Sequence, residues 1–118
     1  MLAAADEDLT LAKLVLPSST THAAKFAYLA ALHSAMAALV FFNGDAPKTH
    51  SGVRNLFSKL AKDNEMLGGD LGRFLARAYD YKDAADYRFE AALPREDAEA
   101  AIESASDMLA RIRKAMAK

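Results

Sequence analysis

The sequence predicts an all-α protein, an antiparallel up-and-down bundle of four long helices and one short helix. Alanine is abundant, whereas the 118 residues include only 5 Gly and 3 Pro, which favours helix over sheet. Apolar residues recur at the spacing of amphipathic helices, and no segment alternates as a strand would. A chain of this length suits a single domain, residues 1–118, with one core.

The helical segments are placed by their apolar spacing and by the residues that interrupt them. Pro17, Asn43-Gly44, Gly68-Gly69 and Pro94 are breakers or caps at four places along the chain. Because the links between them are short, consecutive helices should lie antiparallel. The predicted segments cover approximately residues 3–16, 18–42, 51–63, 70–87 and 94–118.

The second segment should be the central helix of the bundle. Its second half is apolar nearly all round, which is typical of a helix in a core or in an oligomer interface. The apolar run from Phe26 to Phe42 contains His33 and Ser34 and falls short of the roughly 20 residues of a membrane span. No basic stretch precedes an apolar run at the N-terminus. We therefore expect a cytoplasmic protein without a membrane partner.

Composition and motifs exclude several kinds of site. The chain has no Cys, which rules out disulfides and thiolate metal sites, and its net charge of −1 requires any nucleic acid to meet a local basic patch. The sequence contains no phosphate-binding Gly-rich loop, no nucleophile elbow, no His-Glu-x-x-His and no Glu-x-x-His. We therefore expect neither a cofactor nor a metal ion.

Three histidines are the candidates for acid–base chemistry. His22 opens the second segment and should face solvent, and His33 lies in an apolar run, where a core histidine with its hydrogen bond satisfied is the commoner outcome. His50 is the one histidine in a loop with basic neighbours. It is the candidate catalytic residue, because a histidine changes charge near neutral pH.

The turn that contains His50 joins the most apolar segment to the short third one. Pro47 prevents the preceding helix from continuing, and Thr49 or Ser51 can cap the next helix. Lys48 and His50 then lie at a helix N-terminus, where backbone N–H groups favour anions. The plainer alternative is a capped turn whose polar side chains are simply solvated.

Several motifs occur in order along the chain, namely Ala27-Tyr28-Leu29-Ala30, His33-Ser34-Ala35, Pro47-Lys48-Thr49-His50-Ser51-Gly52-Val53 and Ala85-Asp86-Tyr87. Together they resemble the small single-domain prokaryotic branch of the HEPN family. The resemblance covers nearly the whole chain and implies a helical bundle, commonly a homodimer, with a role beside nucleotides or RNA. Many HEPN proteins are encoded next to a minimal nucleotidyltransferase and act with it as a toxin–antitoxin pair, which implies such a protein as a partner.

The sequence departs from the catalytic members of that family. These are metal-independent endoribonucleases that carry an Arg, four to six residues and then a His. No Arg stands at that spacing before His22, His33 or His50. Lys82 stands where the branch usually shows Arg before Ala-Asp-Tyr, so the positive charge remains while bidentate phosphate recognition is weakened.

A ligand site is predicted where the turn meets the fourth segment. If the third and fourth helices pack antiparallel, basic and aromatic residues of both should gather and suit a phosphate-bearing ligand with a ring to stack. The alternative for Asp86 and Tyr87 is a clamp at a helix end, in which Asp86 pairs with a base and Tyr87 packs under Pro47. The predicted ligand-binding residues are Lys48, Thr49, His50, Arg54, Arg77, Lys82, Asp86 and Tyr87.

Three functions from different classes remain open at this stage. The first is a non-catalytic module that binds a nucleotide, an RNA or a nucleotidyltransferase partner. The second is an endoribonuclease that pairs His50 with Arg54, Arg77 or Lys82. The third is a structural homodimer without a ligand. The apolar excess on the second segment favours a two-fold dimer, in which this surface would be buried. The residues that carry this excess are Phe26, Leu29, Met36, Val40 and Phe42.

Overall fold

The structure is a computed structural model that describes residues 2–87 and 93–117, with side chains described outside residues 84–87. Within these residues every regular element is an α-helix, which confirms the predicted all-α class. The helices are α1 (Leu2–Val15), α2 (Thr20–Asn43), α3 (His50–Asp63), α4 (Gly69–Tyr87) and α5 (Arg95–Met116).

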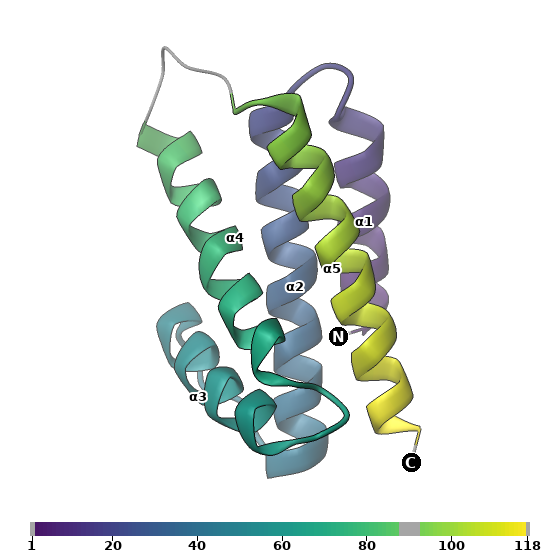
Figure 1. Cartoon of the computed structure of the whole chain (residues 1–118), viewed down its shortest axis with the longest axis vertical. Helices are drawn as coiled ribbons and strands as arrows, with labels where there is room; N and C mark the ends of the chain where they lie inside the picture. The colour runs from purple at the N-terminus through teal and green to yellow at the C-terminus, as the bar shows by residue number, and fades with distance from the viewer. Residues whose placement is uncertain (1, 88–92, 118) are drawn as a thin grey trace.

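The long helices alternate in direction around α2. Figure 1 shows α1 rising, α2 descending, α4 rising and α5 descending, with α3 as a side element against the lower halves of α2 and α4. The molecule measures 42 × 22 × 22 Å, so α2, at about 36 Å, runs along most of it. Because α2 contacts each of the other four helices, it forms the centre of the bundle, as predicted.

Local chemistry explains where the helices begin and end. The Ser19 hydroxyl accepts a hydrogen bond from the backbone N–H of His22 and so caps α2. At the other end Gly44 takes a left-handed conformation, φ 87°, and its N–H donates to the carbonyl of Val40. Pro94 occupies the N-cap position of α5, so the helix begins one residue after the predicted start at residue 94.

The core is built on α2 from small and large side chains together. Tyr28, Leu32 and Leu39 are at most 1% exposed, and alanines occupy most of the remaining inward positions. Small side chains let the neighbouring helices approach α2 closely, which explains how one helix can contact four others. The buried alanines of α2 are Ala23, Ala24, Ala27, Ala30, Ala31, Ala35, Ala37 and Ala38.

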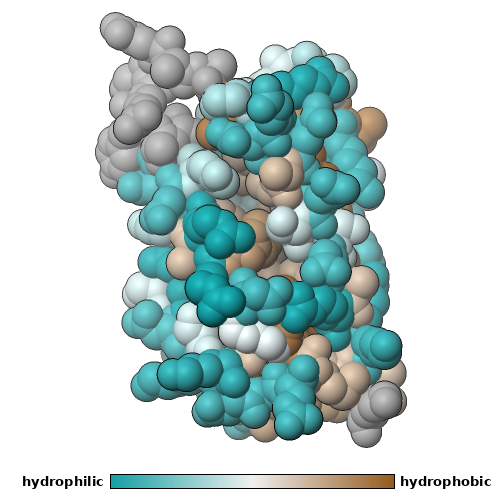
Figure 2. Space-filling view, in the orientation of Figure 1, coloured by the Kyte–Doolittle hydropathy of each residue, from teal (hydrophilic) through white to brown (hydrophobic). Residues whose placement is uncertain are grey.

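This central position also accounts for the apolar character of α2. By length and composition alone α2 could cross a membrane. However, 56% of its most apolar 18-residue window is buried within the bundle. Packing in the core accounts for this hydrophobicity, and the face of the bundle drawn in Figure 2 carries mostly hydrophilic residues.

Two of the histidines have partners in the bundle. His33 Nδ1 lies 2.6 Å from Asp8 Oδ2, so α1 and α2 are joined by a pair whose histidine side chain is 30% exposed. The hydrogen bond of His33 is satisfied as predicted, but the residue lies at the edge of the core instead of inside it. His22 is exposed, as predicted, and its Nδ1 lies 2.8 Å from the Ser19 hydroxyl.

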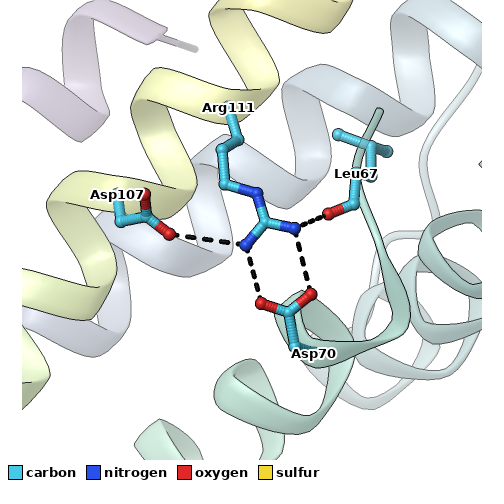
Figure 3. A network of polar contacts seen from close by, with 4 residues as sticks. All are labelled: Leu67, Asp70, Asp107 and Arg111. Atoms are coloured by element: carbon cyan, nitrogen blue, oxygen red, sulfur yellow. Dashed lines mark hydrogen bonds and ion pairs between the residues drawn. The ribbon is translucent and has the colours of Figure 1, made fainter. Parts of the chain in front are cut away.

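Arg111 of α5 ties the α3–α4 loop to the bundle (Figure 3). Its Nη1 and Nη2 donate to the two carboxylate oxygens of Asp70 at 2.6 and 3.0 Å, and Nη2 also donates to the carbonyl of Leu67. Asp107 accepts a longer bond of 3.4 Å. Gly68 lies against this guanidinium with φ 87°, a conformation that glycine adopts without cost.

We expect Arg111→Met to lower the free energy of unfolding by roughly 1–2 kcal/mol, since it removes a bidentate pair that is partly exposed. The hydrogen bonds from Arg111 hold the pKa of Asp70 below its ordinary value of 3.8. This stabilisation is complete above that value and is lost as the pH falls towards the lower pKa of the folded state. The difference in the free energy of unfolding between wild type and variant, measured by chemical denaturation, should therefore narrow as the pH falls below about 4.

Arg95→Met is the matched control for this prediction. Arg95 pairs with Glu99 on the same helix, and both side chains are more than half exposed. Its removal should change the free energy of unfolding by about 0.5 kcal/mol or less. An equal reduction in stability in the two variants, or a gap that does not change with pH, would contradict the role given to Arg111.

Candidate functional site

The turn before α3 is held by close packing around its first helical turn. Thr49 caps the helix, because its hydroxyl oxygen accepts a hydrogen bond of 3.1 Å from the N–H of Gly52. A Cβ atom on Gly52 would lie 2.8 Å from Cβ of Pro47 and 2.8 Å from Oγ1 of Thr49. Glycine at this position therefore lets the Pro47 ring pack directly on the helix start.

Three helices meet beside this turn in an aromatic–arginine cluster, which we define as Tyr28, Arg54 and Tyr79. Arg54 Nη1 donates to the hydroxyl of Tyr28 at 3.1 Å, and Arg54 Cζ lies 3.7 Å from the ring centroid of Tyr79. The two tyrosine rings meet edge to face, with centroids 5.7 Å apart. Tyr28 is buried, whereas Arg54 and Tyr79 are half-buried, so the guanidinium is fixed by rings and still reaches the surface.

Two further basic side chains border the cluster. The His50 ring lies 6.3 Å from the Tyr28 ring, and Lys82 Nζ lies 5.9 Å from the Tyr79 ring. His50 is exposed and is the first residue of α3, and Lys48, also exposed, lies two residues before it. The structure therefore gathers His50, Arg54 and Lys82 around one pair of tyrosines.

Other predicted site residues are not gathered there. Arg77 is exposed and lies two residues from Tyr79 on α4, about 200° around the helix axis, so it points away from the cluster. The side chains of Asp86 and Tyr87 lie outside the described residues, as does the clamp predicted for them. The hydroxyl oxygen of Thr49 serves as a helix cap, which gives this residue a structural role in positioning His50.

Tyr28 and Tyr79 were not among the predicted ligand-binding residues, although Tyr28 stands in one of the family motifs. A signal was present for Tyr79, because Lys82 follows it at the i+3 spacing that brings side chains to one helix face. Nothing local in the sequence indicates that Arg54, 25 residues earlier, stacks on that ring.

The cluster is suited chemically to an anion. A guanidinium has five N–H donors, and the hydrogen bond to Tyr28 engages one of its nitrogens. No carboxylate of the described residues pairs with Arg54. A planar cation held against a ring and facing two other basic side chains is well placed to bind phosphate. Within the same residues, no group of three or more His, Asp or Glu side chains could hold a metal ion.

Fold and site together define a small all-α domain with a basic, aromatic site between three helices. The model of the HEPN domain matches residues 1–115 of the chain. The chain therefore belongs to the HEPN family, as its motifs predicted. A comparison with curated proteins found no match.

Proposed function

We propose that this HEPN domain binds the phosphate groups of a nucleotide or an RNA at the aromatic–arginine cluster and does not cleave it. The observation that carries the proposal is the fixed position of Arg54, between the Tyr28 hydroxyl and the Tyr79 ring. Since its rotamer is already restrained, little side-chain entropy is lost when a phosphate binds.

Several groups have to contribute to the affinity. The N-terminus of α3 adds only about 0.3–1 kcal/mol for an anion at the surface. Charge-assisted hydrogen bonds from Arg54, Lys82 and Lys48 supply more, because each is stronger than a bond between neutral groups. The exposed His50 ring offers a face on which a base can stack.

The first test replaces the two lysines at the rim of the site. Lys48→Ala combined with Lys82→Ala should weaken binding of a short single-stranded RNA about tenfold and lower its salt slope by roughly 1.4, since each neutralised phosphate contributes about 0.7. Fluorescence anisotropy at two salt concentrations measures both quantities. Lys13→Ala combined with Lys114→Ala is the control, because it removes the same charge from exposed positions on α1 and α5. Equal affinity in the two double variants would contradict the site.

A second candidate function is favoured by the placement of His50. His50 and Arg54 are one turn apart on α3 and both lie beside Tyr28, so they could act as a substitute pair in an endoribonuclease. The Arg-x4–6-His spacing of catalytic family members is absent from the sequence. We therefore expect purified wild-type protein to leave RNA intact. Cleavage that disappears in His50→Ala would favour the ribonuclease instead.

We also propose that the domain acts with a protein partner, a minimal nucleotidyltransferase, in a cytoplasmic toxin–antitoxin pair. We further propose that the domain forms a two-fold homodimer. Support for self-association comes from large apolar side chains on α2 and α3 that remain at the surface. Val40, Phe41 and Leu56 are 38%, 50% and 39% exposed. Of the residues predicted to form this patch, Phe26, Leu29, Met36 and Phe42 are half-buried.

We expect light scattering at micromolar concentration to report a dimer, because such side chains favour burial against a second copy. Phe41→Glu should then shift the protein towards monomer. A wild-type protein that is monomeric under these conditions would contradict the dimer and also the third alternative, a homodimer without a ligand.

A further inference from the structure

A groove lined by two basic residues lies between α3 and α4, away from the aromatic–arginine cluster. It has a volume of about 380 Å³ and is open to solvent. Its lining combines small residues with two cations, one from each helix. The lining residues are Ser58, Lys62, Gly69, Gly72, Arg73 and Ala76.

The floor of the groove is formed by a close approach of the two helices. A Cβ atom on Gly72 would lie 2.8 Å from Oγ and 3.0 Å from Cα of Ser58, so only glycine fits at this point. Because Gly69 and Gly72 carry no side chain and Ala76 only a methyl group, nothing fills the space above the contact. The groove is therefore open above this contact and has room for a small polar group.

The two basic residues border Gly69 at one end of this groove. A Cβ atom on Gly69 would lie 3.4 Å from Nη1 of Arg73 and 4.0 Å from Cα of Lys62. Lys62 and Arg73 are exposed, and neither forms an ion pair or side-chain hydrogen bond with the described part of the chain. Asp70 is the acidic residue of α4 nearest to Arg73 in the sequence, and its carboxylate accepts hydrogen bonds from Arg111. The charge of Arg73 also lowers the pKa of Asp70.

The groove is in line with the aromatic–arginine cluster. Arg54, Ser58 and Lys62 follow one another at i+4 spacing and so lie along one face of α3. Arg54 meets Tyr79 and Ser58 meets Gly72, which shows that this face runs antiparallel along α4. Eight residues of helix separate Arg54 from Lys62 by about 12 Å, so a ligand that reaches both residues needs phosphates on more than one nucleotide.

From this alignment we infer that the α3–α4 groove is a second phosphate-binding site, which holds the backbone of a single-stranded nucleic acid whose other phosphates lie at Arg54. The inference rests on the proposed function and deepens it, because a mononucleotide is too short to reach both sites. The ligand of the domain is then a strand of several nucleotides, bound along the contact between α3 and α4.

Two variants test the groove. Lys62→Gln combined with Arg73→Gln removes both cations, and Ala76→Glu places a carboxylate in the groove from an exposed position. Both should fold normally in circular dichroism and thermal melting, since these side chains are exposed. Lys13→Gln combined with Lys114→Gln matches the charge change of the first variant on α1 and α5. The probes are a single-stranded RNA of about ten nucleotides, a uridine mononucleotide and tripolyphosphate.

Each groove variant should bind the RNA at least about tenfold more weakly than wild type, and the Gln pair should lower the salt slope by roughly 1.4. Binding of the mononucleotide should be unchanged, because it needs only the aromatic–arginine cluster. The control pair should behave as wild type with all three probes.

Other outcomes separate this inference from the proposed function. If the groove variants bind RNA as wild type does, while the variant of Lys48 and Lys82 does not, the groove is overturned and the proposed site stands. Loss of RNA binding in the groove variants alone overturns the proposed site, and with it the strand that runs from Arg54, and leaves the groove as the phosphate-binding site. Loss of tripolyphosphate binding without any loss of RNA binding makes the groove a site for free phosphate and overturns the strand. A wild type that binds none of the probes overturns both.

Discussion

Leu32→Ala should lower the free energy of unfolding by about 2–5 kcal/mol, the cost of a cavity at a buried leucine. Leu32 is 0% exposed on α2, the helix that contacts all the others, so the surrounding side chains have little freedom to fill the space. A domain of this size is stable by only about 5–15 kcal/mol, and the melting temperature should fall by roughly 10 °C or more.

Leu14→Ala is the matched control, because it makes the same chemical change at a position that is 69% exposed. A surface substitution of this kind should stay within about 0.5 kcal/mol of wild type. Both proteins are compared at one concentration, since any dimer makes stability depend on concentration. A similar reduction in stability at Leu14 and Leu32 would contradict the central position of α2.

Arg54→Ala should have the largest effect on ligand binding, a loss of about tenfold to a hundredfold in affinity for single-stranded RNA. It removes the cation that both tyrosines hold, with Nη1 at 3.1 Å from the Tyr28 hydroxyl and Cζ at 3.7 Å from the Tyr79 ring centroid. Charge-assisted hydrogen bonds to a phosphate contribute about 1.5–3 kcal/mol, which corresponds to this range.

Arg54→Lys separates charge from geometry. Lysine keeps the positive charge but lacks the planar group that stacks on a ring and donates to two oxygens at once. We expect it to recover only part of the affinity while the salt slope returns to that of wild type. Full recovery would mean that only the charge at this position matters, and it would contradict the role of the tyrosines.

The fold could be predicted because its signals are local. Pro47 and Gly44 end or cap helices through backbone restrictions that act within a few residues, so the predicted boundaries differ from the observed ones by one or two residues. The burial of α2 also followed from sequence, since a helix that is apolar nearly all round needs partners on several sides.

The site could be predicted only in part, because it depends on how helices are aligned. Thr49 and His50 were placed correctly at the start of a helix, since a cap involves neighbouring residues. The contact of Arg54 with Tyr79 depends on the register of α3 against α4, which the close approach at Gly72 determines. Arg77 was predicted alongside Lys82 as a nearby cation, but the two lie on different faces of α4.

The most direct test of the central claim, that phosphate groups bind at the aromatic–arginine cluster, is an NMR titration of the wild-type protein with a short single-stranded RNA. The largest shifts in backbone amide signals should fall on residues 48–54 and 79–82, with Tyr28 among the shifted residues of α2, and further shifts should fall on residues 58–76 along the α3–α4 groove. Shifts confined to α1 and α5, or no shifts at a concentration where RNA is in large excess, would contradict it.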